Sequence, residues 1–281
     1  MKIGLIDVDG HGFPNIALMK ISSFHKYRKD IVEMATIGDY DICYVSKLFN
    51  FSEDPNSSLI SYKHLYKGGT GYDIKSKLPI RIENCQPDYS IYPLYKFSLQ
   101  FFSRGCIRSC PFCVVREKEG YITPAKPMNL NPQGKYIEVL DNNFFANPEW
   151  KSAISYLLEA NQPVNFHGVD VRIMDEEQAY HLNLLKHRKQ IHIAWDFPEM
   201  DLLPKLNEVI KYIKPYKLMC YVLIGFNSSP EQDLYRVTKL NELGISPFVM
   251  PFNKSDKYQK RFARWVNHKA VFKSVKWENY K

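Results

Sequence analysis

Three cysteines with a short, regular spacing stand near the middle of the chain. Cys106, Cys110 and Cys113 form the pattern C-x3-C-x2-C directly after a predicted strand over residues 99–103. Three thiolates this close together can hold one compact metal centre, whereas a closed tetrahedral zinc site needs a fourth ligand. A [4Fe–4S] cluster normally takes four cysteines, so three of them leave one iron open for an external ligand. The spacing therefore predicts a cluster with the open coordination position that catalysis requires.

Two alternatives exist for the same three thiols. They form a zinc knuckle if a histidine or another cysteine supplies the fourth ligand, or they are ordinary buried thiols. The other three cysteines, Cys43, Cys85 and Cys220, are isolated in the sequence. Disulfides are rare in the cytosol, so in a cytosolic protein all six are expected to be buried thiols, catalytic groups or metal ligands.

The composition is that of a globular protein with a basic surface. The 281 residues are 45% hydrophobic, and 38 basic against 30 acidic residues give a formal net charge of +8. A basic surface favours anionic partners such as nucleotides or RNA, although lysines spread along the chain also form an ordinary solvated surface. The first residues include acids, unlike a signal peptide, and no apolar run approaches the roughly 18 residues of a membrane span. We therefore expect a cytoplasmic protein with no membrane partner.

Strands and helices alternate in the hydrophobic pattern. The first part of the chain follows the order strand, helix, strand, which indicates a parallel α/β unit. After a proline-containing connector over residues 79–93, the alternation predicts a parallel sheet or barrel with function at the carboxyl ends of the strands. The predicted strands cover residues 2–7, 40–46, 99–103, 136–140, 163–167, 190–194, 218–224 and 246–251, and the predicted helices cover residues 15–29, 149–160, 176–186, 203–211 and 231–243.

The cysteine loop and this alternation, over residues 97–251, resemble the radical S-adenosylmethionine (SAM) superfamily. The resemblance implies a [4Fe–4S] cluster whose open iron binds the amino and carboxylate groups of SAM. It also implies reductive cleavage of SAM to a 5′-deoxyadenosyl radical, which takes a hydrogen atom from the substrate. Phe112, the aromatic residue before the third cysteine, would lie by the adenine.

The implied fold class is α/β, with a partial (β/α)6 TIM-like radical SAM barrel and a small N-terminal doubly wound α/β unit. Residues 96–281 would form the barrel and a C-terminal extension, and residues 1–95 the N-terminal domain. That domain resembles the cobalamin-binding domains that precede some radical SAM barrels. Their Asp-x-His-x-x-Gly pattern is incomplete here, because Pro14 stands where the last glycine belongs. We therefore expect no cobalamin.

Further cofactor contacts are implied at the ends of the predicted strands. Asp141, Asn142 and Asn143 follow the strand at 136–140, where the family often binds the amino group of SAM. Their oxygens can accept hydrogen bonds from an ammonium group. Gly225 ends the strand at 218–224 and resembles the bend of the family's adenine-contact strand.

The strand at 163–167 leads into a second set of candidates. Gly168 permits close backbone approach, Asp170 can accept from ribose hydroxyls, and Arg172 can fork onto a carboxylate. The alternative is that Asp170 and Arg172 pair with each other.

Three residues are candidates for binding the substrate or taking part in catalysis. Asp196 follows the strand at 190–194 and should lie near the barrel mouth, unless it is an ordinary loop acid. Asp9 and His11 lie in the glycine-rich turn after the first strand, although many loop histidines have no function.

The nearest subfamily is the queuine lyase family, whose enzymes cut the C–N bond of queuine to release preQ1. Chain length and minimal architecture are similar, so a small molecule, a deazaguanine-type base, is the expected substrate, with flavodoxin or ferredoxin as electron donor. An RNA-modifying enzyme of the methylthiotransferase kind is an alternative, but its second cluster and RNA-binding domain have no counterpart here. A zinc-containing nucleic-acid-binding protein is the alternative from another class, and it rests on the charge of +8 and on the cysteine loop.

Overall fold

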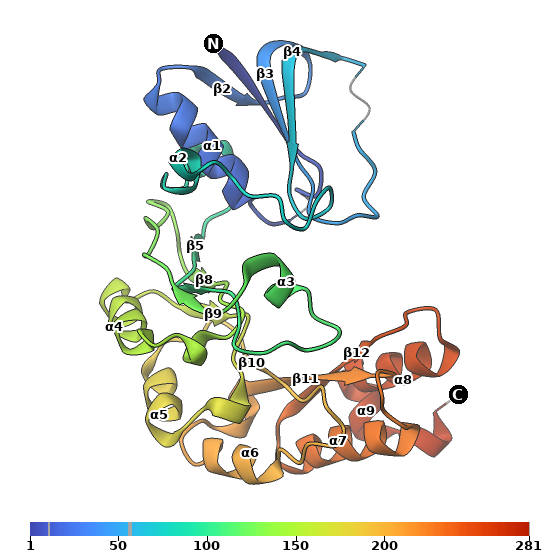
Figure 1. Cartoon of the computed structure of the whole chain (residues 1–281). Helices are drawn as coiled ribbons and strands as arrows, with labels where there is room; N and C mark the ends of the chain where they lie inside the picture. Colours follow the sequence, from blue (N-terminus) through green and yellow to red (C-terminus); the bar gives the residue numbers. More distant parts are fainter. Residues whose placement is uncertain (11, 56–57, 281) are drawn as a thin grey trace. The chain divides into compact units, whose positions relative to one another are not determined.

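The structure is a computed structural model that describes residues 1–10, 12–55 and 58–280 (Figure 1). The contacts divide the chain into two compact units. The first unit holds residues 1–100, 108–121 and 126–135, and the second holds residues 101–107, 122–125 and the chain from residue 136 onward. The predicted domain boundary between residues 95 and 96 stays a prediction.

The first unit contains a parallel four-stranded sheet in the order β2-β1-β3-β4. Strand β1 (Lys2–Asp7) pairs with β2 (Ile31–Met34) on one side and with β3 (Gly38–Ser46) on the other, and β4 (Ile60–Gly68) pairs with β3. The two strands predicted here and the parallel arrangement are confirmed. Neither β2 nor β4 is predicted from the sequence, because β2 is only four residues long and most side chains of the edge strand β4 are exposed.

Helix α1 (Ile16–Tyr27) packs its apolar side on this sheet. Leu18 of α1 joins Ile3 and Leu5 of β1 in one buried cluster, to which the short helix α2 (Ile80–Glu83) adds Ile82. Asn15 caps α1, because its side-chain oxygen accepts from the Leu18 backbone N–H at 3.2 Å. The remaining elements of this unit are η1 (Tyr89–Ile91), β5 (Ser98–Gln100) and α3 (Val115–Glu119).

Parallel strands alternate with helices through the second unit. Strand β8 (Ile137–Val139) pairs with β9 (Val164–Phe166), and a second parallel sheet has the order β10-β11-β12. The chain just before β10 bridges to β9, because His187 pairs with Val164. The other elements are β10 (Ile191–Ala194), β11 (Leu218–Ile224), β12 (Ser246–Pro251), α4 (Trp150–Ala160), α5 (Glu176–Leu184), α6 (Leu203–Val209), α7 (Pro230–Glu242), α8 (Lys257–Asn267) and α9 (Lys269–Ser274).

These strands and the helices between them confirm the predicted alternation, with ends that differ by two residues at most. Ser229 and Gln232 form a capping box at the start of α7, next to a proline in the first turn, as the start signal there predicts. Short segments complete the unit, namely β6 (Ser103–Arg104), β7 (Thr123–Pro124), η2 (Phe144–Ala146), η3 (Val171–Ile173), η4 (Pro215–Lys217) and η5 (Trp277–Asn279). None of the helices in the described part of the chain has the length and apolar character to cross a bilayer.

One strand was predicted over residues 99–103, and this prediction is wrong. The segment holds two short strands, β5 and β6, because Phe102 leaves the ladder between them. Its backbone N–H donates to the Asp141 carboxylate at 3.0 Å, and its carbonyl oxygen accepts from Ala125 N at 2.8 Å and Asn147 Nδ2 at 2.9 Å. Two side chains and one backbone N–H, all far along the sequence, thus replace strand pairing at this position.

The sheet of β10, β11 and β12 has two different faces. Ile193, Cys220 and Val249 lie on a fully buried face, and α7 and α8 contact the strands of this sheet. The alternate residues His192 and Tyr221 are only half-buried, and Phe248 is exposed. Because neighbouring side chains of a strand point to opposite faces, apolar helix packing covers one face and leaves polar and aromatic groups on the other.

Candidate functional site

The cysteine loop follows β6. Cys106 and Cys110 are half-buried and Cys113 is exposed, and a turn between the last two has the Cys113 N–H donating to the Cys110 carbonyl at 3.0 Å. By contacts, Cys106 belongs to the second unit, and Cys110, Cys113 and the half-buried Phe112 belong to the first. Among the described residues, no three His, Cys, Asp or Glu side chains are grouped as a metal site. Cluster binding by these cysteines stays a prediction.

A buried carboxylate holds the chain that leads into this loop. Asp141 lies just after β8, is 1% exposed, and accepts from the Phe102 N–H at 3.0 Å and from the Ser103 hydroxyl at 2.5 Å. Burial raises the pKa of Asp141 to about 6, although these hydrogen bonds act to lower it. Both carboxylate oxygens are engaged, so Asp141 positions the loop here. Its predicted contact with the SAM amino group stays a prediction.

Gly168 allows the next strand end to approach Asp141 and Asn142. A Cβ atom at Gly168 would lie 2.2 Å from the Asp141 carbonyl oxygen and 2.6 Å from that of Asn142. These distances are far below van der Waals contact, so only glycine fits. This is a close approach between protein backbones, and the predicted role of Gly168 in cofactor binding stays a prediction.

Asn143 carries an unsatisfied oxygen beside the first cysteine. The residue is 2% exposed, and its Nδ2 donates to Cys106 Sγ at 3.9 Å and to Asp170 Oδ2 at 3.3 Å. Its Oδ1 is buried and has no hydrogen-bond partner in the part of the chain that the structure describes. A buried acceptor without a partner costs free energy, so this position favours an external donor.

Asp170 and Arg172 form a forked pair, which is the alternative that the sequence left open. Arg172 donates from Nε to Asp170 Oδ1 at 2.6 Å and from Nη2 to Oδ2 at 2.9 Å. Asp170 also caps η3, since its Oδ1 accepts from the Arg172 N–H at 3.1 Å. The two charges therefore offset each other close to Asn143.

Asp196 follows β10 and is half-buried, and its role in catalysis or substrate binding stays a prediction. Burial raises the pKa of Asp196, and the charge of Asp170 acts in the same direction. The charges of Arg172 and Arg236 act to lower it. Asp141, Asn143, Asp170, Arg172 and Asp196 thus follow the carboxyl ends of parallel strands. Their roles in binding the cofactor or the substrate stay predictions.

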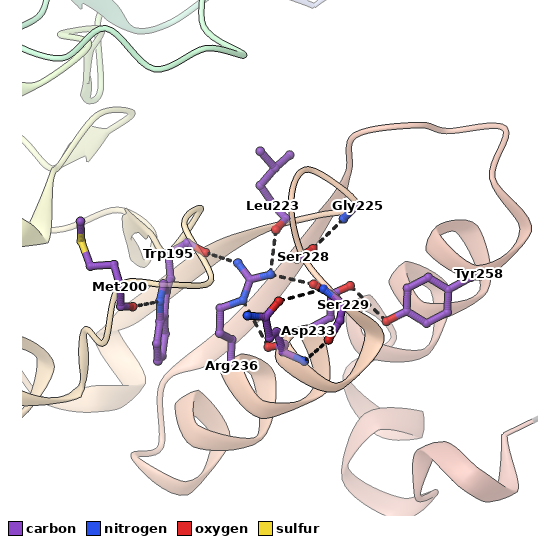
Figure 2. A network of polar contacts seen from close by, with 10 residues as sticks. Trp195, Met200, Leu223, Gly225, Ser228, Ser229, Asp233, Arg236 and Tyr258 are labelled. Atoms are coloured by element: carbon purple, nitrogen blue, oxygen red, sulfur yellow. Dashed lines mark hydrogen bonds and ion pairs between the residues drawn. The ribbon is translucent and has the colours of Figure 1, made fainter.

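A fully buried arginine ties two strand ends together (Figure 2). Arg236 of α7 donates from Nη1 to the Trp195 carbonyl at 2.8 Å and from Nη2 to the Leu223 carbonyl at 3.0 Å. Its Nη2 also lies 2.7 Å from Asp233 Oδ1, and the Tyr258 hydroxyl donates to Asp233 Oδ2 at 3.1 Å. Trp195 directly precedes the candidate acid after β10, so this network positions that acid and the end of β11.

Gly225 follows β11 and has a left-handed backbone with φ of +76°. A Cβ atom there would lie 2.1 Å from the Gln259 side-chain nitrogen. The Gly225 N–H donates to the Ser228 hydroxyl at 2.9 Å and closes the turn toward α7 (Figure 2). The predicted bend is confirmed, and the predicted adenine contact stays a prediction.

The first unit holds two of the candidate residues, Asp9 and His11. Asp9 accepts from the Leu48 N–H at 2.5 Å and from the Ser52 hydroxyl, so it holds the turn after β3. Burial acts to raise the pKa of Asp9, but the hydrogen bonds from Ser52, Leu48 and Phe49 outweigh it and lower the pKa. His11 lies outside the described residues. Catalytic roles for both stay predictions.

A polar group on β8, β9 and β10 is not predicted from the sequence. Glu138 is buried, and its Oε2 accepts from Asn165 Nδ2 at 2.7 Å and lies 2.5 Å from His167 Nε2. The His167 and His192 rings lie 6.4 Å apart. Burial acts to raise the pKa of Glu138, but its hydrogen bonds to His167 and Asn165 outweigh it and lower the pKa. The available signal was a charged or amide residue in the middle of two predicted buried strands.

Comparisons with known proteins bear on this arrangement. No protein-family model and no curated protein matches the chain. It is similar to the solved structure of TsrM from Kitasatospora setae, a radical SAM methyltransferase with cobalamin and a [4Fe–4S] cluster bound, with a TM-score of 0.64 over 89% of this chain and 74% of that chain. The chain therefore has a fold similar to that of this methyltransferase. Sequence identity is 11%, so the likeness concerns the fold.

The raised pKa of Asp141 gives the stability of the fold a testable pH dependence. The folded state keeps a proton that the unfolded chain releases between pH 3.8 and about 6, so the free energy of unfolding contributed by Asp141 falls as pH rises through this window, by up to about 3 kcal/mol. Asp141→Asn keeps an acceptor for Phe102 and removes the titration. We expect the variant to be more stable than the parent at pH 7.5 and to have a flatter pH profile in denaturant unfolding.

Asp39→Asn is the matched control for this experiment. Asp39 is an exposed aspartate that accepts from the Ser61 hydroxyl in the first unit, so its replacement removes one carboxylate and keeps a hydroxyl partner. We expect the control to follow the parent profile. Parallel pH profiles for Asp141→Asn and the parent would contradict a buried, proton-binding Asp141.

The arginine network is tested by Arg236→Met. The substitution leaves Asp233 and the carbonyl groups of Trp195 and Leu223 buried without their donor, so we expect a loss of about 3–5 kcal/mol in the free energy of unfolding. Lys239→Met on the same helix removes a solvent-screened pair with Glu242 and should change the free energy of unfolding far less. Equal losses in denaturant titrations of the two variants would rule out a special role for Arg236.

Proposed function

We propose that the protein is a radical SAM enzyme that binds a [4Fe–4S] cluster through Cys106, Cys110 and Cys113. The proposal rests on the fold likeness and on the three-cysteine loop. The observation that carries it is the buried, unpartnered Oδ1 of Asn143, whose amide nitrogen lies 3.9 Å from Cys106 Sγ. An ammonium group bound beside the cluster satisfies this oxygen, and SAM brings such a group.

When bound, the cluster and SAM supply a 5′-deoxyadenosyl radical that abstracts hydrogen from the substrate. The three thiolates hold the cluster, and the Asn143 amide donates to the Cys106 sulfur while its oxygen accepts from the SAM amino group. The Asp170–Arg172 fork fixes the Asp170 oxygens, which are offered to the ribose hydroxyls. Asp141 holds the start of the loop.

The fold proposal is a partial (β/α)6 barrel formed from residue 96 onward. Its support is the run of parallel strands β8 to β12 with a helix after each of the first four, and the bridge between β9 and the chain before β10. Phe112 and Gly225 face the adenine in this proposal. The N-terminal domain binds no cobalamin, because Pro14 interrupts the pattern, and the enzyme works in the cytoplasm with flavodoxin or ferredoxin as donor.

For the reaction we propose a lyase that cleaves the C–N bond of queuine and releases preQ1. A guanine-like edge needs carboxylate acceptors for its N–H groups, and Asp196, Asp9 and His11 are the proposed substrate contacts. Asp196 is the strongest of the three, because burial raises its pKa next to the Asp170–Arg172 pair. The second candidate is an RNA-modifying radical SAM enzyme, which the net charge of +8 favours.

The deciding experiment follows SAM cleavage in anaerobic, reconstituted protein. With dithionite and SAM, we expect a brown protein that forms 5′-deoxyadenosine, and in the presence of queuine also preQ1, both followed by mass spectrometry. Cys106→Ala should lose the cluster and all 5′-deoxyadenosine. A colourless protein with one bound zinc would overturn the proposal, whereas 5′-deoxyadenosine without preQ1 would overturn only the lyase reaction.

Asn143→Ala tests the observation that carries the proposal. The variant lacks the acceptor for the SAM amino group, so we expect at least about tenfold weaker SAM binding to the reconstituted protein, the effect of losing one hydrogen bond to a charged group. Asn207→Ala changes an exposed asparagine of α6 and should bind SAM like the parent. Equal SAM affinity for Asn143→Ala and the parent, measured by equilibrium dialysis, would remove Asn143 from the SAM site.

A further inference from the structure

A second polar feature lies at the amino-terminal edge of the sheet of β10 and β11. It is a pocket of about 380 Å³ between the chain that leads into β10 and the turn η4 that leads into β11. Asp196 and Gly225 follow these same strands at the opposite edge. The pocket is lined by Leu185, Lys186, His187, Arg188, Lys189, Gln190, Tyr216 and Lys217.

Hydrogen bonds hold the walls of this pocket together. Gln190 Nε2 donates across it to the carbonyl oxygens of Tyr216 at 2.7 Å and Leu218 at 3.1 Å. The chain that leads into β10 is also bonded to β9. The Val164 N–H donates to the Lys186 carbonyl at 2.7 Å, and the Val164 carbonyl accepts from the Arg188 N–H at 2.9 Å. The pocket is therefore formed before any ligand arrives.

The lining carries four permanent cations and no acid. Lys186 Nζ donates to the Asn161 amide oxygen at 2.7 Å, and Lys217 Nζ donates to that of Asn183 at 3.1 Å, so these partners leave the charges uncompensated. Arg188 is 3.9 Å from the buried Glu138 carboxylate, the outer limit of an ion pair.

The positive charge of the pocket acts on a histidine in its lining, and a further lysine adds to that charge. Burial lowers the pKa of His187, and the charge of Lys217 acts in the same direction. Lys269 of α9 adds another cation at 3.4 Å from Gln190 Oε1. Like charges held together on a fixed frame repel one another, and a bound anion relieves that repulsion.

We propose that this pocket binds the phosphate backbone of single-stranded RNA. Tyr216 at its rim is 63% exposed and offers a flat ring beside the cations, and the Arg188 guanidinium lies 3.6 Å from the centre of the half-buried Tyr136 ring. Cations interleaved with exposed aromatic rings are the usual surface for single strands, because bases stack while phosphates pair. Lys211 and Lys214 are exposed just before η4 and continue the charge beyond the pocket, which favours a polymer over one nucleotide.

The test measures binding of a fluorescently labelled, single-stranded RNA of about 12 nucleotides by anisotropy in about 50 mM salt. We expect the double variant Lys186→Glu with Lys189→Glu to bind at least about tenfold more weakly than the parent and to show a shallower salt dependence, because two phosphate contacts are lost. Tyr216→Ala should weaken binding about fivefold or more through loss of base stacking.

The matched control is Lys75→Glu with Lys77→Glu, two exposed lysines of the first unit. Both double variants change the formal net charge from +8 to 8 − 4 = +4, so a difference between them reports position and not overall charge. We expect the control to bind RNA within about threefold of the parent. Equal weakening of the two double variants, or no RNA binding by the parent, overturns the proposal.

Two further measurements distinguish RNA binding from the binding of a small anion and from the radical chemistry. Pyrophosphate that binds to the parent, in the absence of any RNA binding, identifies a small-anion pocket and overturns the RNA assignment. The Lys186→Glu, Lys189→Glu variant should form 5′-deoxyadenosine from SAM like the parent, because the pocket lies at the opposite edge of the strands from Asp196. RNA binding therefore stands or falls independently of the radical chemistry.

Discussion

The candidate site depends on one buried carboxylate. Asp141 sits just after β8 and accepts from the Phe102 N–H and the Ser103 hydroxyl, which belong to the chain leading into Cys106. A carboxylate is costly to bury unless its oxygens are bonded, and a backbone N–H is costly to bury unless it has an acceptor. Each segment therefore satisfies the other. The contact between Asn143 and Cys106 joins the same two segments, and it depends on the hydrogen bonds that Asp141 accepts.

Positive and negative side chains offset one another at the carboxyl ends of the strands. Burial raises the pKa of Asp196 and the charge of Asp170 adds to this effect, whereas the charges of Arg172 and Arg236 oppose it. Arg172 is forked onto Asp170, while Arg236 is divided between Asp233 and two carbonyl groups. The cations are thus committed to protein partners. What the edge still offers a ligand is acceptor capacity, at Asn143 Oδ1 above all, and this suits the positively charged amino group of an amino acid.

Local sequence patterns predicted much of this architecture. The strands β1, β11 and β12 match their predicted bounds end to end, because each is a compact run rich in apolar residues. The split between β5 and β6 could not be predicted, since Asp141, which captures Phe102, lies 39 residues away. The pairing of Glu138 with His167 is likewise a long-range contact. The buried pair Asp233 and Arg236 did have a local signal, because both lie on the same helical stripe as Val237 and Leu240.

The two edges of one sheet differ in chemistry because strand direction separates them. The segments that follow β10 and β11 carry Asp196 and the bend at Gly225, and the segments that precede them carry cations. An anion at the preceding edge does not compete with groups at the following edge, yet it shares the same rigid strands. The rigid sheet therefore keeps an anion bound at one edge apart from the candidate site at the other.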